Sequence, residues 1–232
     1  MKIMFVSAAN STHTVRWVNA LAERGHEVYL VSNRGHEPKE DALNSRVKLY
    51  LMKHSGGKGY YLNAGELRKI AKRINPDVIN VHYASGYGTL ARKARLPKYI
   101  LSVWGGSDVY DFPYESRVKN YILKRNVRSA SYLASTSNCM AVQLKKVMQD
   151  EKLEITITPP FGVDLNQFDP KKYKETEKEE LIIGNIKALE EIYGIEEMIL
   201  AFRDLKKELE QEHYSRKIKL LIYGSGKQKR TV

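Results

Sequence analysis

Histidine, serine and aspartate side chains lie at or just after the ends of short apolar runs in this sequence. Ser11 and His13 follow the first run. His82 closes a later run, and Asp108 comes soon after the next one. A histidine can exchange a proton near neutral pH, and hydroxyl and carboxylate groups can hydrogen-bond a substrate. These residue types indicate a site for a polar ligand, with acid or base chemistry open to the histidines.

Each of these residues also has a purely structural interpretation, which the sequence leaves open. Ser11 can be the N-cap of a following helix, and Asp108 can cap the next helix in the same way. His82 can be a partly buried histidine whose hydrogen bonds are satisfied within the protein. Gly105, which precedes Ser107 in a paired-glycine segment, allows either a tight turn or close approach of the backbone to a ligand.

Several sequence patterns for other chemistries are absent. The segment Gly224-Ser225-Gly226-Lys227 has Gln228 where a phosphate-binding loop needs a hydroxyl, and Lys229 where a dinucleotide fingerprint needs glycine. The sequence contains no Cys-x-x-Cys, His-Glu-x-x-His or Asp-x-Asp pattern. We therefore expect no zinc site, no metal-bound diphosphate and no dehydrogenase activity.

Alternating strands and helices must position the candidate residues. Short apolar runs alternate with segments of helical periodicity over about 150 residues, which predicts a doubly wound α/β fold with a parallel sheet. Because ligands of such sheets bind beyond the carboxyl ends of the strands, the candidate residues lie in suitable places. The expected strands are 2–7, 27–32, 46–51, 77–82, 98–103 and 131–135; the expected helices are 14–24, 62–74, 87–95, 115–128 and 138–149.

A proline-containing connector, 158–170, precedes a second unit. The second unit is predicted to contain a strand at 181–184, a helix at 192–209 and a strand at 217–223. We therefore expect a first domain over 1–165 and an incomplete second domain over 166–232.

Charge and composition narrow the class of protein. The chain has 232 residues, a net charge of +12 and 42% hydrophobic residues, which excludes a disordered chain. No apolar run approaches the roughly 20 residues of a membrane-spanning helix. The first run is too short for a signal peptide, and the single cysteine, Cys139, forms no internal disulfide, so we expect a cytoplasmic protein. Residues 1–165 carry 25 basic and 14 acidic side chains, which suggests an anionic partner for that part.

The order of several motifs resembles the family-four glycosyltransferases, and in particular the bacterial type that builds surface polysaccharides. The motifs run along nearly the whole chain: HTVRWVNALAERGHEVYLVS, PDVINVHYASGYGTLA, SVWGGSDVY, ASTS, PPFGVDLNQF, IIGNIKALEEIYGIEEMILAF and LLIYGSGK. The resemblance implies a GT-B fold of two Rossmann-like domains, the first binding the acceptor and the second a nucleotide sugar. It also implies sugar transfer with retention of the anomeric configuration and no bound metal or other cofactor.

The resemblance assigns roles to individual residues. His82 matches the histidine beside the reacting sugar. On the acceptor side are Ser11, His13, Gly105, Ser107 and Asp108. On the donor side are Lys187, as a cation for the diphosphate, and the glycine loop, Gly224 and Gly226. Without a metal, a cation and backbone amides must stabilise the leaving diphosphate.

The sequence departs from the family at several points. Trp104 replaces a common histidine, and Ile192 and Tyr193 stand where a second basic residue is usual. The family's paired glutamates would lie beyond Val232, so we expect this chain to be truncated and inactive alone.

A binding module without catalysis is the alternative function. The expected helix 115–128 mixes basic and apolar residues, which is typical of attachment to anionic lipid but also of an ordinary solvated surface. Such attachment to the inner face of a membrane would suit an enzyme with a glycan or lipid-linked acceptor. No motif for nucleic-acid binding is present.

Overall fold

The computed structural model describes residues 1–159, 162–163, 165–166, 168–172 and 180–230. The chain divides into two compact units, Met1–Gly162 and Val163–Val232. Part of the expected connector over 158–170 lies outside the described residues, namely residues 160, 161, 164 and 167.

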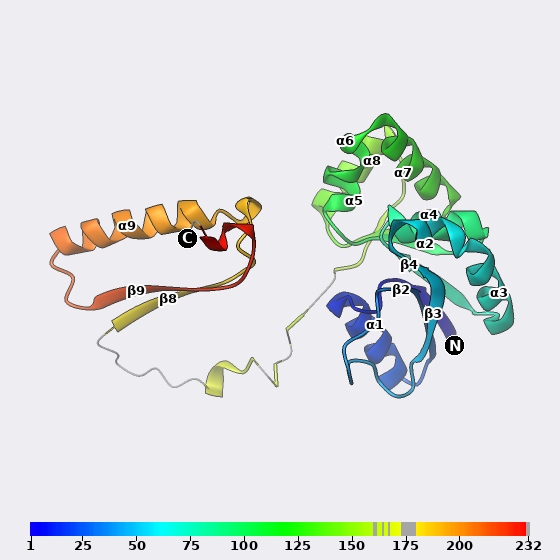
Figure 1. Cartoon of the computed structure of the whole chain (residues 1–232), viewed down its shortest axis with the longest axis horizontal. Coiled ribbons are helices and arrows are strands. Elements are labelled where there is room, and N and C mark those ends of the chain that lie inside the picture. The colour runs from blue at the N-terminus through cyan, green and yellow to red at the C-terminus, as the bar shows by residue number, and fades with distance from the viewer. Residues whose placement is uncertain (160–161, 164, 167, 173–179, 231–232) are drawn as a thin grey trace. The chain divides into compact units, whose positions relative to one another are not determined.

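A seven-stranded, wholly parallel sheet forms the centre of the first unit (Figure 1). The strand order is β3-β2-β1-β4-β5-β6-β7, which extends the order of doubly wound Rossmann sheets by one strand. The predicted fold class is therefore confirmed. The strands are β1 (Lys2–Val6), β2 (Glu27–Arg34), β3 (Lys48–Ser55), β4 (Val78–His82), β5 (Ile100–Val103), β6 (Tyr132–Ser135) and β7 (Thr156–Ile157).

The helices of the first unit are α1 (Thr12–Glu23), α2 (Gly56–Leu62), α3 (Ala64–Ile74), α4 (Gly86–Ala94), α5 (Ser107–Tyr110), α6 (Phe112–Glu115), α7 (Arg117–Ser129) and α8 (Asn138–Met148). Three short helices among them, α2, α5 and α6, were not predicted. The expected helix 62–74 is α3, which begins at Ala64, after the buried Asn63, whose amide bonds Asn33 and His54. The expected helix 115–128 is interrupted at Ser116, which is extended and caps the longer part through the N–H of Lys119.

The central strands are buried on both faces, which explains their uninterrupted apolar sequences. In β1, Met4 and Val6 belong to a large apolar cluster that includes residues of α3, α4, α7 and α8. Ile3 and Phe5 belong to a smaller cluster on α1. Since successive side chains of a strand point to opposite faces, this one strand anchors two helical layers.

The second unit contains two parallel strands, β8 (Glu180–Ile186) and β9 (Lys217–Tyr223), and the helix α9 (Ile195–Gln211). Helix α9 lies along one face of the strand pair, as Figure 1 shows. The other face exposes apolar side chains among the described residues, including Ile186 at 84% and Tyr223 at 59%. Short 3-10 segments cover Pro170–Lys172, Glu191–Tyr193 and Lys227–Arg230.

Across the described part of the chain, helices with the length and apolar character of a membrane span are absent.

Helix α2 packs closely against the end of β3 at Gly59. A Cβ atom at this position would lie 2.6 Å from the carbonyl oxygen of His54 and 3.1 Å from Nδ2 of Asn33. Backbone atoms cannot move aside as a flexible side chain can, so Gly59 fixes how near α2 lies to the sheet.

We predict that Gly59→Ala lowers the free energy of unfolding by about 1–3 kcal/mol, the usual cost of forcing an extra carbon into a packed site. Gly65→Ala is the control, because a Cβ at Gly65 in α3 meets no atom within 4 Å. The free energy of unfolding of that variant should rise by up to about 1 kcal/mol, because alanine has a higher helix propensity than glycine. Urea denaturation of both variants checks the prediction, and equal midpoints would contradict it.

Candidate functional site

The topology of the first unit brings the carboxyl ends of β1 and β4 side by side. These two strands pair in parallel at the centre of the sheet, and the chain runs outward from them in opposite directions. Such a switch point is where open α/β sheets bind their ligands. The loop that begins at Ser7 and the loop that begins at Tyr83 both start there.

Three aromatic rings form a stack at this edge. The imidazole of His82 lies 4.8 Å from the indole of Trp104, measured between ring centroids, and His13 stacks on Trp104 at 5.6 Å. Trp17 from α1 meets Trp104 edge-on at 6.5 Å. The structure therefore brings together two predicted site residues, His13 and His82, with Trp104 between them.

His82 is buried and uncharged. Only 1% of the residue is exposed, and neither ring nitrogen has a hydrogen-bond partner among the described residues. Burial, together with the nearby His13, lowers the pKa of His82 from its usual 6.5 to about 3. An unpaired buried polar group costs free energy, so this imidazole is a candidate for a ligand contact. Trp104 covers it in this structure.

Asp108 holds the loop after β4. Its two carboxylate oxygens accept hydrogen bonds from the backbone N–H groups of Ala84 (2.8 Å) and Ser85 (3.1 Å). Burial raises the pKa of Asp108, and the hydrogen bonds from Ser85 and Ala84 oppose that shift. Because both oxygens are occupied and the residue is 1% exposed, Asp108 positions the loop. This geometry gives Asp108 a positioning role, and its contact with an acceptor stays a prediction.

Asn126, from α7, holds the same loop from its carbonyl side. Its Nδ2 donates to the carbonyl oxygens of Ala84 (2.8 Å) and Ser85 (3.1 Å) and contacts Oγ1 of Thr89 (2.8 Å). Its Oδ1 accepts from Nε of Arg92. Sequence reasoning missed this residue, since an asparagine within a basic helix gives no local sign of a loop 40 residues earlier.

The other predicted acceptor-side residues lie at the same edge. Ser11 is half-buried, and its hydroxyl lies 3.4 Å from the hydroxyl of Tyr83. Gly105 is half-buried, and a Cβ there would come within 3.5 Å of the ring of Tyr83. Ser107 begins α5 and is exposed. Ser11, His13, Gly105 and Ser107 thus gather around one edge of the sheet.

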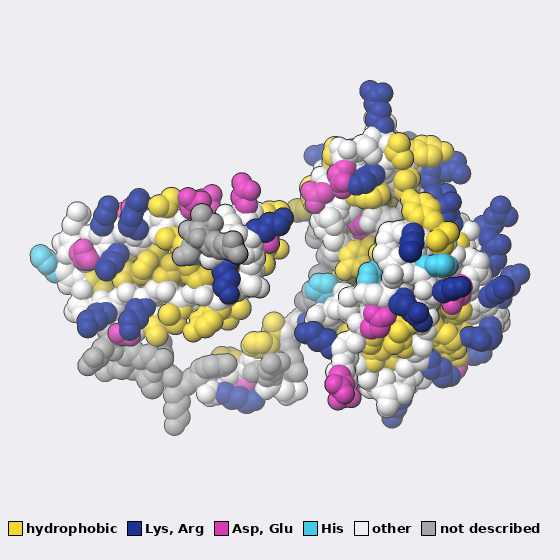
Figure 2. Space-filling view, viewed as in Figure 1, with side chains coloured by type: hydrophobic (Ala, Val, Ile, Leu, Met, Phe, Trp, Pro, Cys, Tyr) yellow, Lys and Arg dark blue, Asp and Glu magenta, His cyan; other side chains and the backbone are white. Residues whose placement is uncertain are grey.

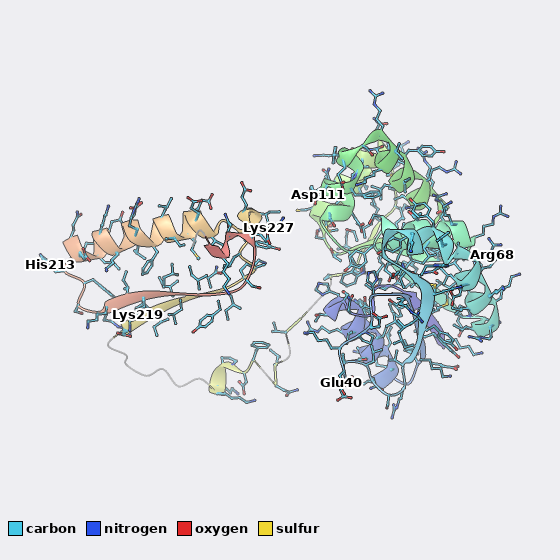
Figure 3. The ribbon with its side chains drawn as sticks, viewed as in Figure 1. Glu40, Arg68, Asp111, His213, Lys219 and Lys227 are labelled. Atoms are coloured by element: carbon cyan, nitrogen blue, oxygen red, sulfur yellow. The ribbon has the colours of Figure 1, made fainter. Side chains whose placement is uncertain are left out.

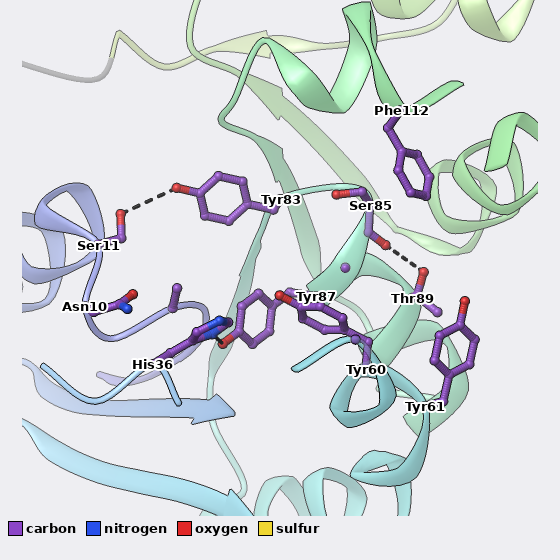
Figure 4. Close-up of a pocket in the computed structure, with 13 residues that line it drawn as sticks. Asn10, Ser11, His36, Tyr60, Tyr61, Tyr83, Ser85, Tyr87, Thr89 and Phe112 are labelled. Carbon is purple, nitrogen blue, oxygen red and sulfur yellow. Dashed lines mark hydrogen bonds between the residues drawn. The ribbon is translucent and has the colours of Figure 1, made fainter. Parts of the chain in front are cut away.

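A pocket of about 490 Å³ opens beside these residues (Figure 4). It is formed by segments that follow β1, β2, β3, β4 and β5. Tyrosines dominate its walls, and Ser11 is the one predicted site residue among its described lining. The described residues that line it are Ala8, Asn10, Ser11, His36, Gly57, Tyr60, Tyr61, Tyr83, Ser85, Gly86, Tyr87, Thr89 and Phe112. The four tyrosines lie within 28 residues of sequence, which was the one available signal.

Tyr87 connects the pocket to the sheet. Its hydroxyl accepts from the N–H of Asn33 (3.2 Å) and lies 2.7 Å from Nδ1 of His36. Tyr60 meets the ring of Tyr87 edge-on at 5.2 Å. Burial raises the pKa values of both tyrosines and lowers that of His36. The aromatic wall is therefore packed and uncharged near pH 7.

In the second unit, the three predicted donor-side residues also lie together. They follow β8 and β9, whose carboxyl ends lie side by side. A Cβ at Gly224 would lie 1.9 Å from the carbonyl oxygen of Lys187, and a Cβ at Gly226 would lie 2.2 Å from that of Leu189. Both glycines are thus required by packing alone. Nζ of Lys187 lies 4.1 Å above the ring of Tyr193, and Lys227 follows the glycine turn (Figure 3).

Among the described residues, no three His, Cys, Asp or Glu side chains are grouped so as to hold a metal ion.

We predict that His82 makes the first unit sensitive to acid. The pKa of His82 is lower in the folded protein than in the unfolded chain, so its stabilising effect is complete above about pH 6.5 and is lost progressively toward pH 3. Between these pH values, this one group lowers the free energy of unfolding by up to about 1.4 kcal/mol for each pH unit of acidification.

His82→Phe should flatten the fall in unfolding free energy between pH 6.5 and 3, because phenylalanine does not titrate. His13 and His36 also have lowered pKa values, but they are present in both proteins, so the difference between the two curves isolates His82. Chemical denaturation at a series of pH values measures it. Parallel curves for the two proteins would show that His82 does not carry the effect.

Solved structures of low sequence identity share this fold. Sucrose-phosphate synthase from Thermosynechococcus elongatus has a TM-score of 0.67 at 10% identity, over 96% of this chain and 70% of that one. Anabaena HepE, in complex with UDP and glucose, has a TM-score of 0.56 at 12% identity, over 96% of this chain and 69% of HepE. Staphylococcus aureus MnaA, solved with UDP, has a TM-score of 0.54 at 15% identity, over 99% of this chain and 63% of MnaA. The likeness confirms the predicted GT-B fold.

Sequence comparison points to the same class. No curated protein sequence matches the chain significantly. The family described as glycosyl transferase 4-like, however, matches residues 2–137. This match includes the loops that carry His13, His82 and Asp108, and it extends over more than half of the chain. The protein therefore belongs to the glycosyl transferase 4-like family.

Proposed function

We propose that this protein takes part in sugar transfer from a nucleotide sugar to a glycan or lipid-linked acceptor, with retention of the anomeric configuration. In this proposal the first unit binds the acceptor and the second binds the donor. The observation that carries it is the buried His82, whose ring nitrogens are unpaired at the switch point of a sheet that belongs to a glycosyltransferase family.

The chemistry available in the second unit supports a diphosphate-containing donor. Lys187 is exposed and places a positive charge beside the glycine turn of Gly224 and Gly226. A cation can stabilise the negative charge that develops on a leaving diphosphate. HepE and MnaA, which share the fold, were solved with UDP, and this supports a nucleotide as the donor's carrier.

In the first unit, a sugar can contact His82 only if Trp104 moves. The indole lies across the imidazole, and both residues are buried. A sugar hydroxyl would supply the hydrogen bond that the ring nitrogens lack and so compensate for the displaced stacking contact. In the proposal, His82 is neutral and accepts or donates a hydrogen bond beside the reacting sugar.

We predict that Lys187→Ala weakens the binding of a nucleotide sugar by about tenfold, the effect of losing one charge-assisted hydrogen bond of roughly 1.5 kcal/mol. Isothermal titration of the full chain with UDP-glucose, UDP-galactose and GDP-mannose measures this. Lys206→Ala, a change of one exposed lysine on α9, is the control and should bind as the unaltered protein does.

Binding of a nucleotide sugar by this chain would contradict the expected truncation of its donor side. If none binds, Lys187 and the glycine turn do not form a donor site by themselves. Where transfer is observed, proton coupling constants of the product give its anomeric configuration, and an inverted product would refute retention.

Attachment to a lipid surface is a second candidate function, favoured by the exposed side of α7. Val118 and Tyr121 are 67% and 61% exposed, and Arg125 lies over the ring of Tyr121. Exposed apolar side chains flanked by arginine are typical of helices that lie on anionic membranes. Basic side chains, dark blue in Figure 2, are spread over much of the first unit.

We predict that the double variant Arg125→Glu, Arg128→Glu reduces co-sedimentation with vesicles containing phosphatidylglycerol by at least about tenfold. Each basic residue near an anionic surface contributes roughly 1 kcal/mol, and charge reversal adds repulsion. The control variant Lys145→Glu, Lys146→Glu makes the same change of charge on α8. Equal loss in both variants, or no binding by the unaltered protein at low salt, would contradict a specific role for α7.

A further inference from the structure

We propose that the tyrosine-walled pocket of the first unit binds an uncharged sugar ring of the acceptor, and not a phosphate or a lipid diphosphate. This inference rests on the proposed function and specifies the acceptor's chemistry. The pocket is the cavity beside Ser11 and Tyr83 described above, with a volume of about 490 Å³. Small-molecule sites commonly have volumes of about 300–1,000 Å³, so a saccharide fits its size.

The pocket lining carries no formal charge. None of its thirteen residues is Lys, Arg, Asp or Glu. Its titratable imidazole, His36, is bonded through Nδ1 to the hydroxyl of Tyr87, and burial lowers the pKa of His36, which keeps it neutral near pH 7. Lys93 does not line the pocket, although its Nζ lies 5.2 Å from the ring centroid of Tyr61. A phosphate would therefore meet no cation among the lining residues, and desolvating an unpaired anion is costly. This contrasts with the strongly basic surface of the same unit.

Aromatic walls suit the apolar faces of a sugar ring. Tyr60, Tyr61 and Tyr83 line the pocket together with Phe112, as Figure 4 shows. Large aromatic side chains present apolar area at small entropic cost, and tyrosine adds a polar group at the ring edge. A pyranose has the complementary character, since C–H groups form its faces and hydroxyl groups its rim.

Hydrogen-bonding groups at the pocket remain available for such hydroxyls. The hydroxyls of Tyr60 and Tyr61 make no hydrogen bond with another described residue. The contact between Ser11 and Tyr83 is long, at 3.4 Å. Hydroxyl groups both donate and accept, as a neutral sugar requires of its site. A purely lipid ligand would leave these polar groups without partners.

The test is saturation-transfer NMR on the full chain, with methyl glycosides of glucose, galactose and mannose as probes. The corresponding hexose 6-phosphates form the charged arm, and dodecyl phosphate is the lipid-like arm. We expect at least one methyl glycoside to bind, and to bind more tightly than its 6-phosphate. A phosphorylated or lipid-like probe that binds better than every methyl glycoside would overturn the proposal, as would the absence of glycoside binding.

Three variants locate the binding. Tyr61→Ala removes one wall and should weaken the glycoside by at least about tenfold, while Tyr60→Phe keeps the packing and removes one hydroxyl. Tyr132→Ala, on β6 and outside the pocket, is the matched control. Tyr61 is 46% exposed, so the first variant should fold, which circular dichroism checks. Unchanged glycoside binding in Tyr61→Ala and Tyr60→Phe would overturn the assignment to this pocket.

The nucleotide-sugar titration and the glycoside measurements test different sites, so their results can differ. If UDP-glucose, UDP-galactose or GDP-mannose binds and no glycoside does, the assignment of the pocket fails while the donor assignment stands. If a glycoside binds in the pocket and no nucleotide sugar binds, this chain holds no donor site by itself and the pocket remains a sugar-binding site.

Discussion

The arrangement of the first unit's site depends on how one short loop is held after β4. Asp108 accepts from the two backbone N–H groups of Ala84 and Ser85, and Asn126 donates to the two carbonyl oxygens of the same residues. These contacts of Asp108 and Asn126, here called the clamp, pair both the N–H and the carbonyl groups of a buried backbone segment. Each of those polar groups would cost about 1–3 kcal/mol if left unpaired. Because this loop connects His82 to α4, the same contacts fix the histidine, Tyr83 and the pocket wall.

The clamp also separates two kinds of polar group at the edge of the sheet. Asp108 and Asn126 are buried, and their hydrogen bonds hold the backbone of the loop after β4. His82 is buried just as deeply with its nitrogens unpaired. Nε1 of Trp17 and Nδ2 of Asn33 share this lack of a partner. The missing hydrogen bond is the feature that calls for a ligand at His82, and burial alone does not.

The two units place their candidate residues at corresponding positions, but the residues differ in chemistry. Both place their candidate residues beyond the carboxyl ends of neighbouring parallel strands. In the first unit the result is an uncharged, aromatic pocket, and in the second it is a lysine beside a glycine turn. Uncharged aromatic walls suit a sugar, and a cation suits a diphosphate, so the division agrees with the two substrates of the proposed transfer.

The sequence by itself determined the alternation of strands and helices. It also determined that His13 and His82 lie at the carboxyl edge of the first unit's sheet, and that Lys187, Gly224 and Gly226 lie at that of the second unit's strand pair. Strands buried on both faces are continuous apolar runs, and helices have a local period, so both can be predicted from neighbouring residues. Only the tertiary structure decided that Asp108 is a clamp, that Asn126 is its partner, and that Tyr60, Tyr87 and Phe112 form one pocket. Those roles arise from residues that follow different strands and meet only because parallel strands carry their loops to one edge. No periodicity within the chain encodes such a meeting, because it depends on the order of the strands in the sheet.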